Sequence, residues 1–124
     1  MASARILYLD DEEPLVFIFK RMLERLGHQV AGFTNAEAAL AAFSAAPESF
    51  HLVLSDMSMP GMSGIDFATA VLKLRPETLV VIASGYMDPK DAEQAKVAGV
   101  HDCIRKPNTL DEMRDMVTAL LPSL

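Results

Sequence analysis

Short apolar runs alternate with longer amphipathic segments along the chain, and this alternation limits the folds that it can adopt. The short runs include Ile6 to Leu9, Leu52 to Leu54 and Leu79 to Ala83. Apolar residues at helical spacing mark longer segments such as Leu15 to Leu26 and Ile65 to Leu74. Strands that alternate with helices in this way form βαβ units around a parallel sheet. Because the strand runs are rich in Leu, Val and Ile, helices should cover both faces of that sheet.

The length of the chain fits one such unit. Its 124 residues can bury one sizeable core and are too few for two. No repeat, low-complexity tract or flexible linker interrupts the pattern, so five strands and five helices account for the sequence from end to end. We therefore expect residues 1–124 to form a single α/β domain.

The first helix is the best defined in the sequence. Pro14 suits its first turn, and Gly27 can end it in a left-handed conformation. Val16 and Phe17 are predicted to lie off its buried stripe. The residues predicted to form that stripe are Leu15, Ile18, Phe19, Met22 and Leu26.

Capping patterns predict where later helices begin. Thr34 with Glu37, and Thr109 with Glu112, have the spacing of a capping box.

The segment from Lys90 to Ala98 carries mostly alanine on its inner side, so this helix should be held less firmly than the others.

Charge, cysteine content and hydropathy exclude several classes of protein. A net charge of -6 and a pI near 4.9 argue against direct nucleic-acid binding, which usually requires a basic surface. The single cysteine, Cys103, cannot form an internal disulfide and fits a reducing, cytoplasmic compartment. No apolar stretch approaches the roughly 20 residues of a membrane span, and the first run is too short for a signal peptide.

Polar residues follow the predicted strands at the points where the strands end. Asp10 and Asp11 come after the first strand, Asp56 after the third, Ser84 after the fourth and Lys106 after the fifth. Right-handed crossovers bring the carboxyl ends of parallel strands to one edge of the sheet, where ligands bind in open α/β folds. Three carboxylates, a hydroxyl and an ammonium are therefore expected to converge there.

This set of groups is typical of magnesium-assisted phosphoryl chemistry. Mg²⁺ prefers a few carboxylate oxygens and completes its shell with water and phosphate. A carboxylate can attack phosphorus to form an acyl phosphate when the developing charge is neutralised. Lys106 and Mg²⁺ are the expected neutralisers, and without phosphate a cation must offset the repulsion among the three carboxylates.

The motifs that carry these residues resemble the receiver domain of response regulators over nearly the whole chain. They are ILYLDDEEP at 6–14, LSDMSMPGMSG at 54–64, VIASGY at 81–86 and the Lys106-Pro107 pair. The resemblance implies a flavodoxin-like, doubly wound (βα)5 fold whose parallel five-stranded sheet has the order 2-1-3-4-5, an order that a chemotaxis response regulator exemplifies.

The resemblance also implies a role for each residue of the cluster. Asp56 corresponds to the phosphoacceptor and Asp11 to a direct Mg²⁺ ligand. Asp10 corresponds to a ligand that acts through water, and the backbone carbonyl of Ser58 to a further ligand. Lys106 would contact the phosphoryl oxygens.

Two further features follow from the resemblance. Ser84 occupies the position of the family's switch hydroxyl, which turns toward the phosphoryl group and changes a surface of the domain. The bond between Lys106 and Pro107 is expected to be cis, as in the family, a geometry that occurs almost only before proline.

The chain departs from the family at one position that concerns switching. Three residues before Lys106 the family commonly has an aromatic side chain whose rotamer reports phosphorylation, and here that residue is Cys103. Tyr86 could supply a moving ring instead, but a loop tyrosine resting on the surface is the favoured interpretation. The residues that correspond to Ser58 and Tyr86 flank the phosphoryl position in the family, so the resemblance implies that these two tune the lifetime of the acyl phosphate.

The partners implied are a histidine kinase or a histidine phosphotransfer protein, and a downstream protein that the sequence does not identify. Val16 and Phe17 could belong to the phosphodonor's docking surface beside the site. The domain is expected to be a monomer or a phosphorylation-dependent dimer, without direct contact with nucleic acid or membrane. It resembles both single-domain response regulators and the receivers of hybrid histidine kinases.

Two other functions use similar residues. A haloacid-dehalogenase-type phosphatase also has an aspartyl nucleophile and Mg²⁺, but it needs a second aspartate two residues later, where this chain has Ser58. A pseudo-receiver would bind partners without phosphorylation and would usually lack Asp56, Asp11 or Lys106, all of which are present. The sequence therefore favours a phosphoacceptor that assists its own phosphorylation and dephosphorylation and is not otherwise an enzyme.

Overall fold

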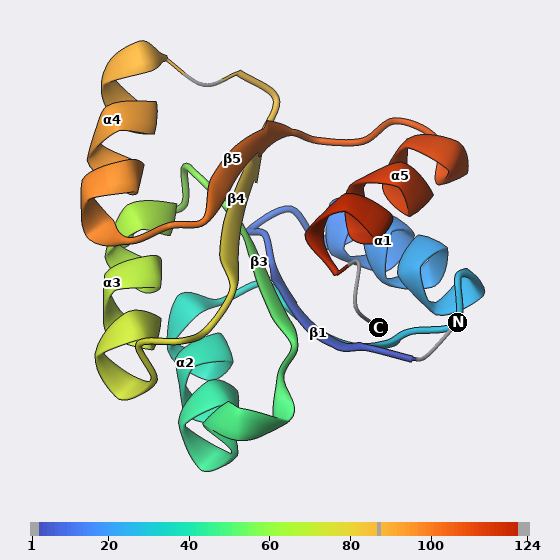
Figure 1. Cartoon of the computed structure of the whole chain (residues 1–124), viewed down its shortest axis with the longest axis horizontal. Helices are drawn as coiled ribbons and strands as arrows, with labels where there is room; N and C mark the ends of the chain where they lie inside the picture. The colour runs from blue at the N-terminus through green and yellow to red at the C-terminus, as the bar shows by residue number, and fades with distance from the viewer. Residues whose placement is uncertain (1–2, 87, 122–124) are drawn as a thin grey trace.

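The computed structural model describes residues 3–86 and 88–121 and shows a parallel sheet between two layers of helices (Figure 1). The strands are β1 (Arg5–Leu9), β2 (Gln29–Phe33), β3 (Leu52–Asp56), β4 (Val80–Ser84) and β5 (Asp102–Arg105). The helices are α1 (Glu13–Arg25), α2 (Ala36–Ala45), α3 (Gly64–Leu74), α4 (Pro89–Ala98) and α5 (Leu110–Leu120), with one short 3-10 turn at Pro47–Ser49. The strand order is β2-β1-β3-β4-β5, and every adjacent pair is parallel. The expected fold class and strand order are confirmed.

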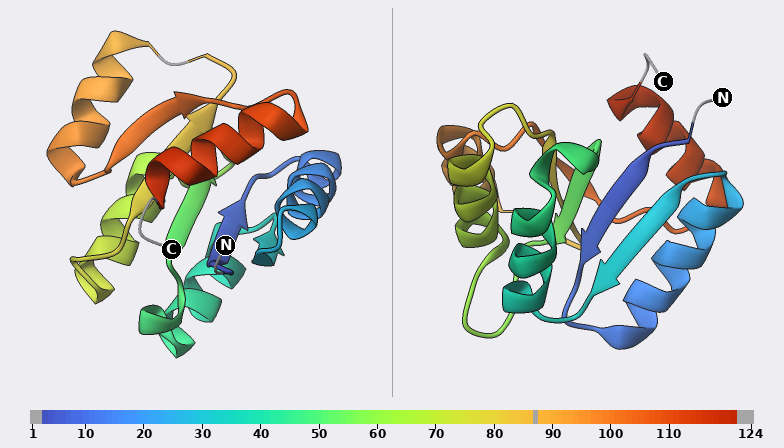
Figure 2. Two further views of the ribbon diagram at one scale, coloured as in Figure 1. Left: turned by 45° about the vertical axis from the view of Figure 1, so that its right-hand side comes forward. Right: turned by 90° about the horizontal axis from the view of Figure 1, so that it is seen from below.

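Two hydrophobic cores lie on opposite faces of the sheet, because successive strand side chains point to opposite sides. Leu7 and Leu9 of β1 belong to the core under α2, α3 and α4. Ile6 and Tyr8 of the same strand belong to the core under α1 and α5. The two layers of helices are separated by the sheet in both views of Figure 2. Burial on both faces explains why the strand runs are continuously apolar.

The first helix has the predicted ends but a partly different buried stripe. Pro14 lies in its first turn, and Gly27 follows it with a φ of 98°. Val16 is buried, whereas Ile18 is 46% exposed, so the prediction was wrong for both residues. For Val16 the cause lies on β2: a Cβ at Gly32 would collide with Val16, so the absence of a side chain there lets Val16 pack against the sheet.

The predicted caps are partly confirmed. Thr109 caps α5, since its hydroxyl accepts the backbone N–H of Glu112 at 3.1 Å. The Glu112 carboxylate, however, accepts the N–H of Asn108 and not that of Thr109. The N-cap of α2 is Asn35, not Thr34; an asparagine side chain caps a helix at least as well as threonine.

The fourth helix buries little apolar surface, as its alanine content predicts. Ala95 is its one buried residue among those described, and Val97 on the same helix is 82% exposed. No helix in the described part of the chain is long and apolar enough to span a membrane.

Two histidines bind the beginning of β1, at the edge of the sheet opposite to the polar cluster. The Nδ1 atom of His28 accepts the backbone N–H of Ala4 at 3.0 Å, and the Nδ1 atom of His51 accepts that of Arg5 at 2.9 Å. His28 is buried, and this burial lowers its pKa below the ordinary value.

Replacing His28 with asparagine is expected to make stability less sensitive to mild acid. Because the pKa of His28 is lower in the folded than in the unfolded protein, its contribution is fully present above the unfolded pKa of about 6.5 and is lost as the pH falls through the folded pKa. Urea unfolding of the wild type and of His28→Asn, from about pH 7.5 to about pH 5.5, measures this difference. Parallel pH profiles for the two proteins would contradict the prediction.

Candidate functional site

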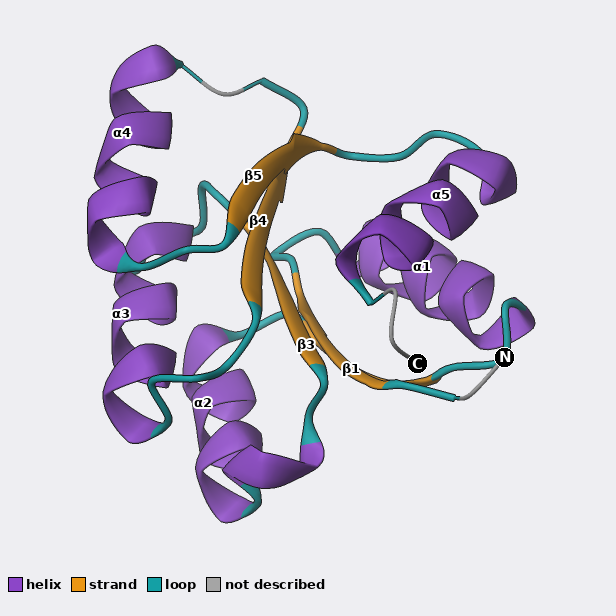
Figure 3. Cartoon of the chain, in the orientation of Figure 1, coloured by secondary structure: helices purple, strands orange, loops and turns teal. Residues whose placement is uncertain are grey.

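The carboxyl ends of the strands carry an acidic cluster, as the sequence predicts. Figure 3 shows the loops from β4 to α4 and from β5 to α5 leaving the same end of the sheet. Asp10 directly follows β1, Asp56 is the last residue of β3, and Lys106 directly follows β5. One oxygen each of Asp10, Asp11 and Asp56 lies within 4.8 Å of the others. The parallel strands therefore bring together residues that are far apart in the sequence.

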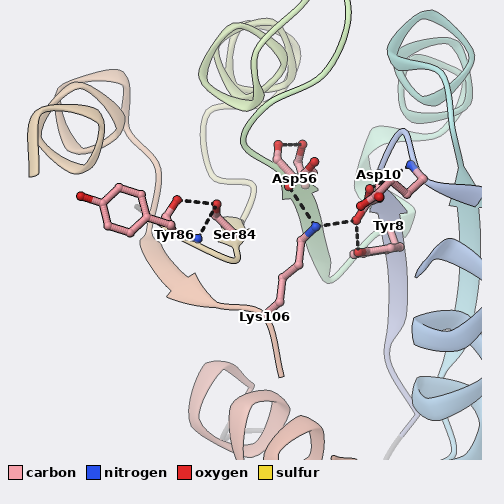
Figure 4. Close-up of polar contacts among 8 residues, drawn as sticks. Tyr8, Asp10, Asp56, Ser84, Tyr86 and Lys106 are labelled. Atoms are coloured by element: carbon pink, nitrogen blue, oxygen red, sulfur yellow. Dashed lines mark hydrogen bonds and ion pairs between the residues drawn. The ribbon is translucent and has the colours of Figure 1, made fainter. Parts of the chain in front are cut away.

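Lys106 connects two of the three carboxylates (Figure 4). Its Nζ atom lies 2.9 Å from Oδ2 of Asp10 and 3.1 Å from Oδ1 of Asp56. Its backbone N–H donates to the carbonyl of Ser84 at 2.9 Å, which ties the β5–α5 loop to the end of β4. The side chain of Lys106 is 16% exposed, so the ammonium is shielded from water but not enclosed. A partly shielded cation beside Asp56 is well placed to meet an incoming anion.

Asp10 is completely buried, and both of its carboxylate oxygens are hydrogen-bonded. Oδ2 accepts the hydroxyl of Tyr8 at 2.8 Å in addition to the Lys106 ammonium. Oδ1 accepts the backbone N–H of Glu12 at 3.0 Å. The sequence pattern does not single out Tyr8, because a tyrosine within an apolar strand is ordinarily one more core residue. The spacing could have revealed it, since residues two apart on a strand point to the same face.

Burial and mutual charge change the pKa values of the site. Burial raises the pKa of Asp56, with a smaller contribution from the negative charge of Asp10, and Lys106 opposes this rise. Burial alone would lower the pKa of Lys106, but its ion pairs with Asp10 and Asp56 outweigh burial and raise it. Burial and the hydrogen bond to Asp10 raise the pKa of Tyr8 well above its ordinary value, so its hydroxyl remains a donor. The site thus concentrates negative charge that a single ammonium does not balance.

The donor set fits a divalent cation that prefers oxygen. The three clustered groups are carboxylates, and Asp11 is exposed at the entrance while the other two are buried. Such hard oxygen ligands suit Mg²⁺, which takes few protein ligands and keeps water in its shell. Ser58 lies in the exposed loop two residues beyond Asp56, where its carbonyl is the further ligand predicted.

The loop after Asp56 is fixed to the beginning of α3. The backbone N–H of Gly64 donates to the carbonyl of Met57 at 2.7 Å. A Cβ on Gly64 would collide with the carbonyl of Asp56, so only glycine permits this approach. Ser63 and Asp66 form a complete capping box at the same point. The backbone that carries Asp56 is therefore held by close packing as well as by the strand.

Ser84 and Tyr86 lie beside the cluster, and the Ser84 hydroxyl bonds to the backbone of Tyr86 and not to the side chains of Asp10, Asp56 or Lys106. The Ser84 hydroxyl donates to the carbonyl of Tyr86 at 2.7 Å and accepts the Tyr86 N–H at 3.3 Å. Figure 4 shows these two bonds apart from the contacts that join Asp56, Lys106 and Asp10. Tyr86 is 79% exposed, which agrees with a loop tyrosine on the surface.

Two expectations concern the fifth strand and the residues after it: one for Cys103 on β5, and one for Pro107, which follows the strand. Cys103 is half-buried on β5 against the core under α4, and burial raises the pKa of its thiol. It is therefore a small strand residue without the features of a reactive thiolate. The bond from Lys106 to Pro107 is trans, since the described residues contain no cis peptide, and the predicted cis geometry is wrong. Trans is the lower-energy form of an X-Pro bond by roughly 0.5–1 kcal/mol, and this loop accommodates it.

The fold and the site together define a class: a flavodoxin-like α/β domain with an acidic cluster and a lysine at the carboxyl edge of its sheet. Residues 6–118 match the response regulator receiver domain family. The chain belongs to this family, whose members are signalling domains of two-component systems and phosphorelays.

Characterised relatives include both sensors and transcriptional regulators. The chain is 31% identical over 121 residues to the virulence sensor protein BvgS of Bordetella pertussis, covering 90% of this chain and 10% of BvgS. It is 33% identical over 112 residues to the C4-dicarboxylate transport transcriptional regulatory protein DctD of Rhizobium meliloti, covering 90% of this chain and 24% of DctD. The chain thus spans no more than a quarter of the length of these relatives.

Solved structures agree with the fold. A response regulator receiver domain protein from Clostridium thermocellum superimposes with a TM-score of 0.87 at 29% identity, covering 96% of this chain and 94% of that one. The chemotaxis protein CheY4 of Vibrio cholerae gives a TM-score of 0.88 at 24% identity, over 97% and 100% of the two chains. The second similarity supports the fold only.

Proposed function

We propose that residues 1–124 form a single receiver domain that accepts a phosphoryl group on Asp56 from a histidine kinase or a histidine phosphotransfer protein. Mg²⁺ would be held by Asp10, Asp11, Asp56 and the carbonyl of Ser58. The observation that carries this proposal is the position of the Lys106 ammonium, 2.9 Å from Asp10 and 3.1 Å from Asp56. The family to which the chain belongs supports the same function.

In the proposed reaction a carboxylate oxygen of Asp56 attacks the phosphorus atom of a phosphohistidine. A phosphorus–oxygen bond forms while the phosphorus–nitrogen bond breaks, and the imidazole nitrogen keeps the electron pair and takes up a proton. Lys106 neutralises part of the charge on the phosphoryl oxygens during transfer. Bound Mg²⁺ would supply further positive charge at the same oxygens. The chain thus modifies its own carboxylate and turns over no separate substrate.

The surroundings of the carboxylates favour Asp56 over Asp10 as the acceptor. Both oxygens of Asp10 are occupied, by Tyr8 and Lys106 on one side and by the N–H of Glu12 on the other. Asp10 is also fully buried, whereas the side chain of Asp56 is 11% exposed. An in-line attack on phosphorus requires an accessible oxygen, which Asp56 offers.

The phosphodonor is proposed to dock on α1 beside the site. Phe17 is 61% exposed there and lies under the Arg21 guanidinium, and Ile18 is exposed next to it. Val16, the other residue predicted for this surface, is buried and is not available. Exposed apolar residues next to a reaction centre are typical of a protein interaction surface. The signal would then pass to a downstream protein through a conformational change of the domain's surface.

Intact-mass measurement after incubation with acetyl phosphate tests the proposed function. The wild type is expected to gain the mass of one phosphoryl group in the presence of Mg²⁺ and none after chelation of the metal. Asp56→Asn should gain nothing, because the amide is not a nucleophile toward phosphorus. Asp115→Asn, at an exposed position of α5, is the matched control and should behave as the wild type.

Each alternative outcome is informative. If a folded wild-type protein gained no mass, that result would favour the function of a pseudo-receiver, which binds partners without phosphorylation. A gain that persists in Asp56→Asn would assign the phosphoryl group to another residue and contradict the proposal.

A further inference from the structure

Tyr8 is a buried tyrosine at the site for which phosphoryl transfer to Asp56 requires no role. We propose that it is a positioning residue for Lys106: its hydroxyl keeps Asp10 hydrogen-bonded, so that Lys106 can turn from Asp10 to a phosphoryl group on Asp56. This inference rests on the proposed function, since it concerns how the same site is tuned.

The geometry of Asp10 is the starting point. One oxygen, Oδ2, accepts two donors, the Tyr8 hydroxyl at 2.8 Å and the Lys106 ammonium at 2.9 Å. The other oxygen accepts the N–H of Glu12. The ring of Tyr8 is fully buried against Phe19, with centroids 5.1 Å apart, so the hydroxyl has a fixed direction. Tyr8 and Lys106 therefore share one fixed, buried oxygen as acceptor.

Phosphorylation changes what Lys106 must bind. In the unphosphorylated domain the Lys106 ammonium contacts both Asp10, at 2.9 Å, and Asp56, at 3.1 Å. A phosphoryl group on Asp56 adds oxygens with more negative charge than the carboxylate, and the ammonium is expected to move toward them. That movement removes a donor from Oδ2 of Asp10.

When a buried carboxylate oxygen loses its only hydrogen-bond donor, the free energy of that state rises. With Tyr8 present, Oδ2 of Asp10 keeps one donor after Lys106 has moved, and this cost is avoided. With phenylalanine at this position, Oδ2 would depend on Lys106 alone and would retain the ammonium. The Tyr8 hydroxyl thus favours the arrangement in which the Lys106 ammonium contacts the phosphoryl group.

A structural role of the ring in the core beneath α1 is the competing explanation. Tyr8→Phe separates the two, because it removes one oxygen and leaves the ring against Phe19. Thr78→Val is a matched control. It also deletes a buried hydroxyl, one that donates to the carbonyl of Arg75 at 2.7 Å in the loop before β4, at the opposite edge of the sheet.

The kinetic test uses acetyl phosphate, with the Mg²⁺ concentration varied. Tyr8→Phe is expected to lower the rate constant at saturating Mg²⁺ about threefold to tenfold, the value of one hydrogen bond. The Mg²⁺ concentration for half-maximal rate should change less than about twofold, since the ligand atoms remain. Thr78→Val should keep the wild-type rate.

The same substitution in an Asp10→Asn background shows whether Tyr8 acts through Asp10. A neutral amide holds Lys106 only weakly, so Tyr8→Phe should then change the rate less than about 1.5-fold. An undiminished effect in this background would overturn the inference.

A second measurement needs neither metal nor phosphorylation. Urea unfolding of Tyr8→Phe, Lys106→Met and the double variant, all without Mg²⁺, tests whether the two donors share one oxygen. Each single variant leaves Oδ2 one donor and the double variant leaves none, so the double variant should lose at least about fivefold more in its folding equilibrium constant than the product of the single losses. Additive losses would contradict the inference.

The outcomes distinguish the inference from the function on which it rests. A wild type that is never phosphorylated would remove the proposed function, while the unfolding cycle would still test the shared oxygen. A phosphorylated wild type with an equally fast Tyr8→Phe, or with Thr78→Val slowed to the same extent, would overturn the role of Tyr8 alone.

Discussion

Lys106→Met is expected to slow phosphorylation by acetyl phosphate about 100-fold to 1000-fold, the usual effect of losing one charge-stabilising donor at a reacting oxygen. Lys106 is the sole cation in contact with Asp10 and Asp56 among the described residues. Methionine keeps the apolar stem of the lysine but removes its charge. Time courses of intact mass for the variant and the wild type at saturating Mg²⁺ measure the effect.

Lys73→Met is the matched control for this substitution. Lys73 is exposed in the last turn of α3, away from the carboxyl edge of the sheet, and its replacement should leave the rate unchanged. If Lys106→Met were phosphorylated within about threefold of the wild-type rate, the ammonium would not neutralise charge during transfer. The proposed mechanism would then need another source of positive charge.

Phe67→Ala is expected to destabilise the fold by about 3–5 kcal/mol, the range for a large buried aromatic side chain. Phe67 lies on α3, is completely buried and belongs to the core beneath α2, α3 and α4. Single domains are stable by roughly 5–15 kcal/mol, so this substitution should remove a large part of the total. Urea unfolding followed by circular dichroism gives the difference in unfolding free energy.

Phe17→Ala provides the comparison for the same chemical change on the surface. Phe17 is 61% exposed on α1, and its replacement should change stability by no more than about 0.5 kcal/mol. A cost below about 1 kcal/mol for Phe67→Ala would mean that this core relaxes around the cavity far more than buried sites usually do.

The sequence predicted the fold well because both of its periodicities are strong. Continuous apolar strands and amphipathic helices indicate a covered parallel sheet, and the family resemblance supplied the strand order. The side of a helix that packs on the sheet was less predictable. Val16 is buried because Gly32 on β2 leaves room for it, a contact between helix and strand that periodicity along one helix does not contain.

The site was predictable where it depends on strand ends. Asp10, Asp56 and Lys106 each follow or complete a strand, so parallel topology alone brings them together. Tyr8 was missed because a tyrosine in an apolar run is ordinarily a core residue, and its hydroxyl gains meaning only beside Asp10.

Features that depend on small energy differences were the hardest to predict. The two isomers before Pro107 differ by only about 0.5–1 kcal/mol, so a family resemblance is a weak guide to one of them. The direction of the Ser84 hydroxyl likewise depends on which nearby groups it can bond, and here the backbone of Tyr86 supplies both partners.

The two hydrogen bonds between the Ser84 hydroxyl and the Tyr86 backbone have a consequence for the speed of any signal. A free hydroxyl reorients in picoseconds to nanoseconds, whereas loop segments rearrange in nanoseconds to microseconds. The Ser84 hydroxyl both donates to and accepts from the backbone of the β4–α4 loop, so it cannot turn toward Asp56 until both contacts break. With Cys103 where the family commonly has a rotating ring, rearrangement of the Ser84–Tyr86 backbone, not the flip of an aromatic side chain, would set the pace of a switch that uses Ser84.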